Sequence, residues 1–124
     1  MTTELTHYTP NFSKRELACK CGCTVPVGIA RNLETLAQAL EKMRQLTGPL
    51  IVTSGYRCPL HNKNVGGAKH SNHMQGIAAD VFSKKLTPQE LILFAEMVPE
   101  FANGGIGKYS SWIHVDTRKG KVRW

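Results

Sequence analysis

The sequence has no long apolar run. Nowhere in its 124 residues do about 20 consecutive apolar residues occur, the length that a membrane-spanning helix needs. The first fourteen residues carry Glu4, His7 and several threonines, and they lack the apolar segment of a signal peptide. We therefore expect a protein that is made in the cytoplasm and does not insert into a membrane. If it acts outside the cell membrane, another factor has to release it.

Acidic residues are also scarce. Nine aspartate and glutamate residues stand against sixteen lysine and arginine residues, so the net charge is +7 at pH 7 and the isoelectric point is near 9.5. This charge favours polyanionic partners, which include nucleic acids, anionic wall polymers and membrane surfaces. The basic residues are scattered, apart from Arg118, Lys119, Lys121 and Arg123 near the end of the chain. Because they form no continuous stripe, we expect a generally cationic surface and no nucleic-acid partner.

Internal repeats and low-complexity linkers are absent, so nothing divides the chain. Its length suits one compact domain over residues 1–124, and 41% hydrophobic with 20% charged residues is an ordinary globular composition. A chain of this size buries about two-thirds of its unfolded surface, so its core does not depend on disulfide bonds. We expect a soluble monomer.

The four cysteines, Cys19, Cys21, Cys23 and Cys58, leave three interpretations open. Structural zinc sites usually separate paired cysteines by two to four residues, whereas the first three cysteines here are separated by single residues. On an extended chain such side chains point to one face, which does not readily close a tetrahedron. We therefore expect free, partly buried thiols or one disulfide bond from the cluster to Cys58, with a four-cysteine zinc site as the third alternative.

Three helices are predicted. Ser13 and Glu16 form a capping box that indicates a short helix over residues 13–18. A long helix over residues 27–47 is indicated by apolar residues at three- and four-residue steps, namely Leu33, Leu36, Ala37, Leu40, Met43 and Leu46. Thr87, Pro88 and Glu90 occupy the N-cap, N1 and N3 positions of a helix that extends to about Val98.

The remaining regular segments are predicted strands, which alternate with turns rich in glycine and serine. They are residues 50–53, 77–82, 105–109, 112–116 and 121–124, of which the third and fourth form a hairpin. Residues 57–76 are predicted to be a polar, glycine-rich loop. Because helices and strands are mixed without strict alternation, we expect an α+β fold with a small antiparallel sheet flanked by helices.

Polar residues within these apolar strands indicate a site. Asp80 lies in an apolar strand, where a buried carboxylate is costly unless it is paired or bound to a metal. Gly76 and the small residues after it let the backbone double back, so that His73 and Asp80 can converge. His114 and Asp116 share one face of their strand. Two histidines and one aspartate suit a catalytic zinc, although each histidine alone could equally be an ordinary core or surface residue.

Several separated motifs occur in a fixed order along the chain. They are Ser54-Gly55-Tyr56-Arg57, Asn62, Val65-Gly66-Gly67, Ser71-x-His73-x-x-Gly76-x-Ala78-x-Asp80, Gly105-Ile106-Gly107 and Trp112-Ile113-His114-Val115-Asp116. Over roughly residues 12–124 the sequence thereby resembles the zinc D-alanyl-D-alanine carboxypeptidases and the phage peptidoglycan endopeptidases. The resemblance implies the fold that these enzymes share with the N-terminal signalling domain of hedgehog proteins.

The resemblance also implies roles for particular residues. By position, His73, Asp80 and His114 are the Zn²⁺ ligands. Arg57 would hold the terminal carboxylate of the substrate or the developing oxyanion, because its planar fork suits carboxylate oxygens; the alternative is a surface salt bridge. Ser71 would contact the substrate or orient the ligand loop, or would simply be a turn residue. His61 and His70 are expected to be loop histidines rather than ligands.

One position departs from the family pattern. Familiar members carry an acidic general base three residues before the last histidine ligand, and here that position is Ser111. Asp116 is the natural substitute, since it shares a strand face with His114. Two alternatives stay open, because Asp116 could instead orient a ligand or do neither.

The function that follows is zinc-dependent hydrolysis of peptide bonds that involve D-amino acids in peptidoglycan stems. The resemblance allows a D-Ala-D-Ala carboxypeptidase or an L-Ala-D-Glu-type endopeptidase. Without an export signal, the chain fits a phage or prophage endolysin released through a holin-made hole. A non-catalytic zinc-containing wall-binding module is the alternative, and a small nucleic-acid binder that uses the cysteines is a third hypothesis.

Overall fold

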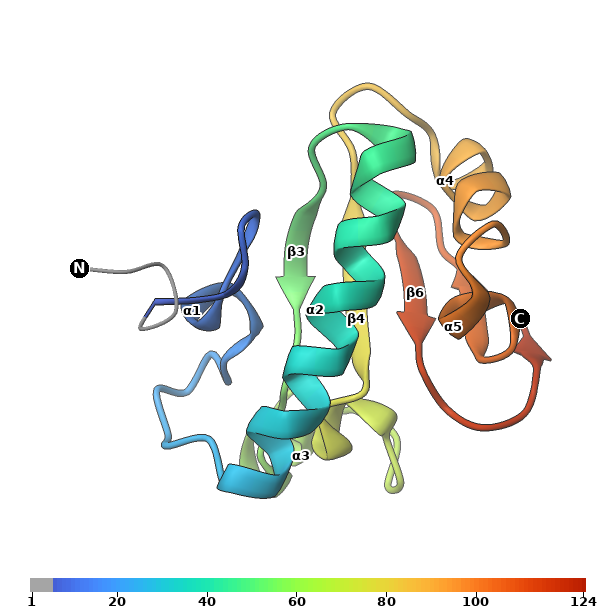
Figure 1. Ribbon diagram of the computed structural model, residues 1–124. Coiled ribbons are helices and arrows are strands. Elements are labelled where there is room, and N and C mark those ends of the chain that lie inside the picture. The colour runs from blue at the N-terminus through green and yellow to red at the C-terminus, as the bar shows by residue number, and fades with distance from the viewer. Residues whose placement is uncertain (1–5) are drawn as a thin grey trace.

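The computed structural model describes residues 6–124 and contains a five-stranded sheet with the order β3-β4-β6-β5-β7 (Figure 1). The strands are β3 (Ile51–Ser54), β4 (Ala78–Phe82), β5 (Gly105–Lys108), β6 (Ile113–Asp116) and β7 (Val122–Arg123). The predicted α+β class is confirmed. Residues 1–5, part of the stretch searched for a signal peptide, lie outside the described residues.

Neighbouring strands are antiparallel except β5 and β7, so the sheet is mixed and not wholly antiparallel as predicted. The connection after β6 explains the difference. Gly105 of β5 pairs with both Asp116, at the end of β6, and Val122, at the start of β7. The chain therefore crosses one end of β5 and enters β7 from that same end. Five residues, 117–121, are too few to run back along the sheet.

Helix α2 (Val27–Thr47) lies across one face of the sheet, as Figure 1 shows. Its fully buried side chains are those of the predicted apolar stripe, except for the exposed Leu46, together with Ala39. The helix ends at Gly48, whose φ of +78° suits a residue without a Cβ atom. The predicted bounds of this helix are confirmed. They could be predicted because the apolar stripe and the glycine that ends the helix are both features of the local sequence.

Helix α4 (Pro88–Ala95) begins as predicted after Thr87 but ends before Val98, and a separate short helix, α5 (Pro99–Ala102), follows it. The capping box of Thr87 and Glu90 is present as predicted. Val98 is extended, as expected for a residue before proline, and Pro99 starts a new turn of helix. Both helices pack against the β5–β6 part of the sheet.

The N-terminal segment forms a small hairpin of β1 (His7–Thr9) and β2 (Phe12–Ser13), followed by α1 (Lys14–Leu17). It packs against α2, and α1 packs against β3. Two contacts fix this packing. Leu17 is fully buried and its carbonyl oxygen accepts a hydrogen bond of 2.9 Å from the backbone of Tyr56. Gly55 lies so close to the Leu17 backbone that any side chain there would overlap it.

The predicted loop 57–76 contains two helical segments that the sequence reading missed, α3 (Pro59–Asn64) and the 3₁₀ helix η2 (Asn72–Gln75). Both are short and polar, so neither has the apolar periodicity that predicts a helix. No helix among the described residues is long and apolar enough to cross a membrane.

Candidate metal centre

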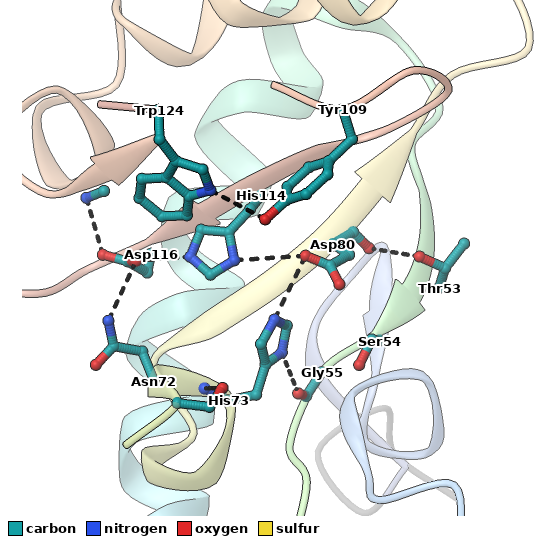
Figure 2. A network of polar contacts seen from close by, with 12 residues as sticks. Thr53, Ser54, Gly55, Asn72, His73, Asp80, Tyr109, His114, Asp116 and Trp124 are labelled. Atoms are coloured by element: carbon teal, nitrogen blue, oxygen red, sulfur yellow. Dashed lines mark hydrogen bonds and ion pairs between the residues drawn. The ribbon is translucent and has the colours of Figure 1, made fainter. Parts of the chain in front are cut away.

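Three side chains from different elements meet in one cluster beside the sheet. Asp80 lies in β4 directly opposite His114 in β6, and His73 comes from η2 (Figure 2). Oδ1 of Asp80 lies 3.4 Å from Nε2 of His73 and 3.4 Å from Nδ1 of His114. The three donor atoms all lie within 4.8 Å of one another. Antiparallel pairing of β4 and β6 therefore brings together two residues that are far apart in the sequence.

The chain around His73 is held from several sides. The hydroxyl of Ser71 caps η2 and accepts a hydrogen bond of 3.2 Å from the His73 amide. Gly76 ends η2 with a φ of +73°, and a side chain there would also overlap Ile29 of α2. The carbonyl of His73 accepts a hydrogen bond of 3.0 Å from the amide of Arg57. Local turns and contacts with α2 and with Arg57 thus fix the position of His73.

Both imidazole rings are oriented by an acceptor behind them. Nδ1 of His73 lies 2.8 Å from the carbonyl oxygen of Gly55, and Nε2 of His114 lies 2.6 Å from a carboxylate oxygen of Asp116. A carbonyl and a carboxylate only accept, so these nitrogens donate. The other nitrogen of each neutral ring then presents a lone pair towards Asp80. Three acceptors that face one another call for a cation, and this donor set suits Zn²⁺.

The ionisable groups of the cluster also favour the binding of a cation. Burial alone would raise the pKa of Asp80, but hydrogen bonds and charge from His114 and His73 hold it well below its usual range. Burial would likewise lower the pKa of His114, but Asp116 and Asp80 raise it. The two carboxylates thus favour positive charge at His114, and a bound metal ion would supply such a charge.

Asp116 lies behind His114, on the side away from Asp80 (Figure 2). Its side chain is fully buried and accepts hydrogen bonds from the amide of Gly105 at 2.8 Å and from Nη2 of Arg118 at 2.7 Å. Burial opposes ionisation, yet His114 and Arg118 hold the pKa of Asp116 well below its usual range. A side chain at position 105 would overlap the Asp116 carboxylate, which explains the first glycine of the Gly105-Ile106-Gly107 motif.

Arg57 lies at the edge of the same cluster. Its Nε donates to Oγ of Ser54 at 3.1 Å, its Nη1 donates to Oδ1 of Asn62 at 3.2 Å, and its Nη2 lies 3.5 Å from Oδ2 of Asp80. The guanidinium group therefore lies in the cleft beside Asp80 and is not part of an exposed surface pair.

Asn62 belongs to one of the sequence motifs, but its role in the structure was not predicted. It is 3% exposed, and its Nδ2 donates to the carbonyl of Ala68 at 2.9 Å while its oxygen holds Arg57. Gly67 packs against this side chain so closely that a Cβ atom would overlap it. Asn62 thus connects Arg57 to the loop at the rim of the cleft, which no spacing in the sequence indicates.

The cluster lies in a cleft of about 550 Å³ with one aromatic wall. Tyr109 and Trp112 stack with ring centroids 4.7 Å apart, and the ring of Trp124 lies 4.8 Å from that of His114. The indole of Trp124 donates a hydrogen bond of 2.9 Å to the hydroxyl of Tyr109. A side chain at Gly107 would overlap this indole, which explains the second glycine of the motif. This aromatic wall was not predicted from the sequence.

The other candidate positions lie outside the metal cluster. Ser71 and His70 line the cleft, with His70 in the exposed loop before η2. His61 is in α3, and Ser111 is exposed in the turn between β5 and β6. Among residues 6–124, the histidines His61 and His70 belong to neither of the residue groups that could hold a metal.

Two histidines and an aspartate that line an open cleft form a donor set of the kind that holds the metal in zinc hydrolases. The family model described as Peptidase M15 matches residues 10–116, which include all three candidate ligands and Arg57. The chain belongs to this family of zinc D-Ala-D-Ala carboxypeptidases and endopeptidases, and the resemblance seen in the sequence is confirmed. No curated protein matches the chain in a sequence comparison.

Proposed function

We propose that this protein hydrolyses peptide bonds next to D-amino acids in the peptide stems of bacterial peptidoglycan. Membership of the M15 family supports a zinc peptidase of peptidoglycan. The observation that carries the proposal is the convergence of three acceptor atoms, from His73, Asp80 and His114, within 4.8 Å of one another. Both rings already have the orientation that metal binding needs.

His73, Asp80 and His114 would hold one Zn²⁺ ion, which when bound supplies Lewis-acid polarisation of the scissile carbonyl and lowers the pKa of water. The remaining steps belong to side chains of the cleft. Arg57 faces the reacting group with its planar fork and stabilises negative charge on the substrate, either an oxyanion or a terminal carboxylate. Ser71 keeps η2 in place through its cap and presents its hydroxyl to the cleft.

Asp116 is proposed to be a positioning residue for His114. Its place on the same strand face as His114 favours a general base, with orientation of a ligand as an alternative. Its full burial, its distance of 2.6 Å from Nε2 of His114 and its hydrogen bonds from Arg118 support the alternative. A carboxylate with these donors and a lowered pKa is a weak base.

His70 is then the candidate for proton transfer. Among the described residues that line the cleft, Asp80 is the only carboxylate, and it already faces both histidine ligands. Histidine is the side chain most often used for general acid–base catalysis, and His70 lines the cleft without belonging to the metal cluster.

The proposed substrate also fits the surface and the cleft. A net charge of +7 would concentrate the protein on anionic wall polymers, and the aromatic wall offers flat contacts for a stem peptide. We propose a lytic role, such as that of a phage or prophage endolysin that reaches the wall through a holin-made hole. We propose that the protein acts as a monomer, with no nucleic-acid partner.

Mass spectrometry of muropeptides after digestion of purified peptidoglycan tests the proposal and identifies the bond. Loss of a terminal D-alanine would define a carboxypeptidase, whereas shorter stems or separated cross-links would define an endopeptidase. His73→Ala is the inactive control. Unchanged muropeptides in the presence of excess Zn²⁺ would refute the enzymatic function.

A non-catalytic zinc-containing wall-binding module is the second candidate. It is favoured by one observation, since neither the exposed Ser111 nor the buried Asp116 offers the cleft a free carboxylate. Co-sedimentation with insoluble walls, measured beside the muropeptide assay, separates the two functions. Binding without cleavage would support the module.

A further inference from the structure

A second group of potential metal ligands lies apart from the histidine–aspartate cluster. Cys19, Cys21, Cys23 and Cys58 each offer a sulfur atom, and the four sulfur atoms all lie within 4.8 Å of one another. Three of the residues come from the segment between α1 and α2, and the fourth follows β3. The four cysteines share no residue with the metal centre described above.

The separations between the sulfur atoms suit a tetrathiolate site. Four sulfur atoms at the usual Zn–S distance of about 2.3 Å lie about 3.8 Å apart at the corners of a tetrahedron. Sγ of Cys21 lies 3.2 Å from Sγ of Cys19 and 3.6 Å from Sγ of Cys58. A disulfide bond is about 2.05 Å long, and all four cysteines are free thiols here. The geometry brings all four together and does not single out one pair.

A turn explains why the narrow spacing permits this arrangement. The expectation that residues 19–23 are extended is wrong, because the amide of Gly22 donates a hydrogen bond of 3.1 Å to the carbonyl of Cys19. Gly22 has a φ of +82°, which residues with a side chain rarely adopt. The chain therefore wraps around one point, and Cys19, Cys21 and Cys23 face it together with Cys58.

Backbone amides are already directed at two of the sulfur atoms. The amide of Cys58 lies 3.4 Å from Sγ of Cys19, and the amide of His61 lies 3.4 Å from Sγ of Cys58. Such N–H···S contacts stabilise thiolates, the form in which cysteine binds metals. Cys19 is 4% exposed, whereas Cys21 is exposed, so a metal ion can reach the group from solvent.

We propose that Cys19, Cys21, Cys23 and Cys58 bind one structural Zn²⁺ ion as four thiolates. Binding would release the thiol protons to solvent. Four sulfur ligands leave no open coordination position, so this zinc would not take part in hydrolysis. The proposal is independent of the peptidase function, because it rests on other residues and on a different metal environment.

The site would stabilise the loop that supports the metal centre. It joins the segment after α1 to the residues after β3, beside the hydrogen bond from Tyr56 to Leu17. That same loop contains Gly55, whose carbonyl orients His73, and Arg57, which precedes Cys58. The second zinc would therefore act on catalysis only through the position of this loop.

Zinc content and cobalt spectra test the proposal. The wild-type chain should contain close to two zinc ions, His73→Ala close to one, and Cys21→Ser/Cys58→Ser close to one. After exchange with Co²⁺, the wild type and His73→Ala should both show intense sulfur-to-cobalt charge-transfer absorption. The double cysteine variant should lose that absorption and keep the weaker bands of the histidine–aspartate site.

The His73→Ala spectrum tests the four-cysteine zinc site even if the double cysteine variant does not fold. Folded His73→Ala without zinc and without sulfur-to-cobalt absorption would overturn the proposal. A native mass lower by the hydrogens of a disulfide bond, or iron in the isolated protein, would also overturn it. Failure of the muropeptide assay would leave these spectra unchanged, so the two proposals can fail separately.

Discussion

Nε2 of His114 lies 2.6 Å from Oδ2 of Asp116, while Nδ1 of the same ring lies 3.4 Å from Oδ1 of Asp80. One imidazole thus lies between two carboxylates that have different roles. Asp116 is fully buried and fixes the ring, whereas Asp80 also faces His73, the other candidate histidine ligand. The pairing of β6 with β4 places Asp80 opposite His114. The position of Asp116 two residues later on β6 places it on the same face.

Asp116→Asn is expected to weaken zinc binding by about 10- to 100-fold, because the amide is a poorer acceptor for the His114 ring. Activity should fall at limiting zinc and recover when zinc is added. Competition with a chromophoric chelator measures the affinity, and Glu34→Gln on the exposed part of α2 is the control. An activity loss of about 10²- to 10⁴-fold at unchanged zinc content would instead make Asp116 the general base.

His70→Gln is expected to lower kcat by about 10²- to 10⁴-fold with unchanged zinc content, since it removes a proton acceptor from the cleft and no ligand. The acidic limb of the pH profile of kcat should change as well. His7→Gln in β1 is the matched control, because it lies outside the cleft lining. A normal kcat and pH profile in His70→Gln would exclude this residue as the base.

Arg57→Lys keeps the positive charge but loses the planar guanidinium group, which donates hydrogen bonds to Ser54 and Asn62. The proposed contact of this group with the substrate is lost as well. We expect a large fall in kcat/KM with only a small change in melting temperature. Arg31→Lys, an exposed arginine in α2, should change neither quantity. Substrates with a free and an amidated C-terminus distinguish the two roles, since a loss confined to the free acid would indicate carboxylate binding. Full activity in Arg57→Lys would contradict both roles.

The stability of the metal-free protein is expected to depend on pH. The lowered pKa values of Asp80 and Asp116 mean that both carboxylates stabilise the fold above about pH 4 and lose this effect as pH falls. The raised pKa of His114 means that its contribution is complete below about pH 6.5 and is lost as pH rises through that pKa. The three contributions therefore coincide between about pH 4 and pH 6.5.

Thermal unfolding of chelator-treated wild type and Asp116→Asn across this range measures that dependence. The difference in melting temperature between the two proteins should be largest between about pH 4 and pH 6.5. A difference that does not vary with pH would show that Asp116 acts through packing alone. Zinc affinity of the wild type should also fall below the His114 pKa, because the metal displaces a proton.

Much of the fold and the convergence of the three candidate ligands could be predicted, for reasons that particular residues illustrate. Helix α2 has a continuous apolar stripe and a glycine end signal, both of which are local. The candidate ligands His73, Asp80 and His114 lie in short motifs, and antiparallel pairing brings them together. Their role as zinc ligands remains a proposal, but their convergence is a property of the structure.

What could not be predicted depends on contacts between distant segments or on turns. Trp124 covers His114 only because β7 pairs with β5 in parallel, which no local pattern indicates. The role of Asn62 depends on the position of Arg57 across a polar loop. The cysteines were judged as if on an extended chain, whereas the positive φ of Gly22 turns the chain around them.

Gly107→Ala tests whether the aromatic wall belongs to the substrate site. A Cβ atom at this position would overlap the indole of Trp124. The backbone of Trp124 is held by hydrogen bonds with Ile106 at 3.1 Å and Lys108 at 2.8 Å, so the ring has to rotate and lose its bond to Tyr109. We expect a higher KM and altered tryptophan fluorescence. Zinc content should stay unchanged, because the hydrogen bond that orients the His114 ring does not involve the indole.

Gly28→Ala is the control for Gly107→Ala, since it is exposed in α2 and a Cβ atom there would meet nothing within 4 Å. Alanine is the better helix former, so this variant should be more stable by up to about 1 kcal/mol with unchanged KM. If Gly107→Ala also left KM and fluorescence unchanged, the indole would not be part of the substrate site. If it lost zinc instead, Trp124 would act on His114 rather than on the substrate, and the aromatic wall would then support the metal ligand.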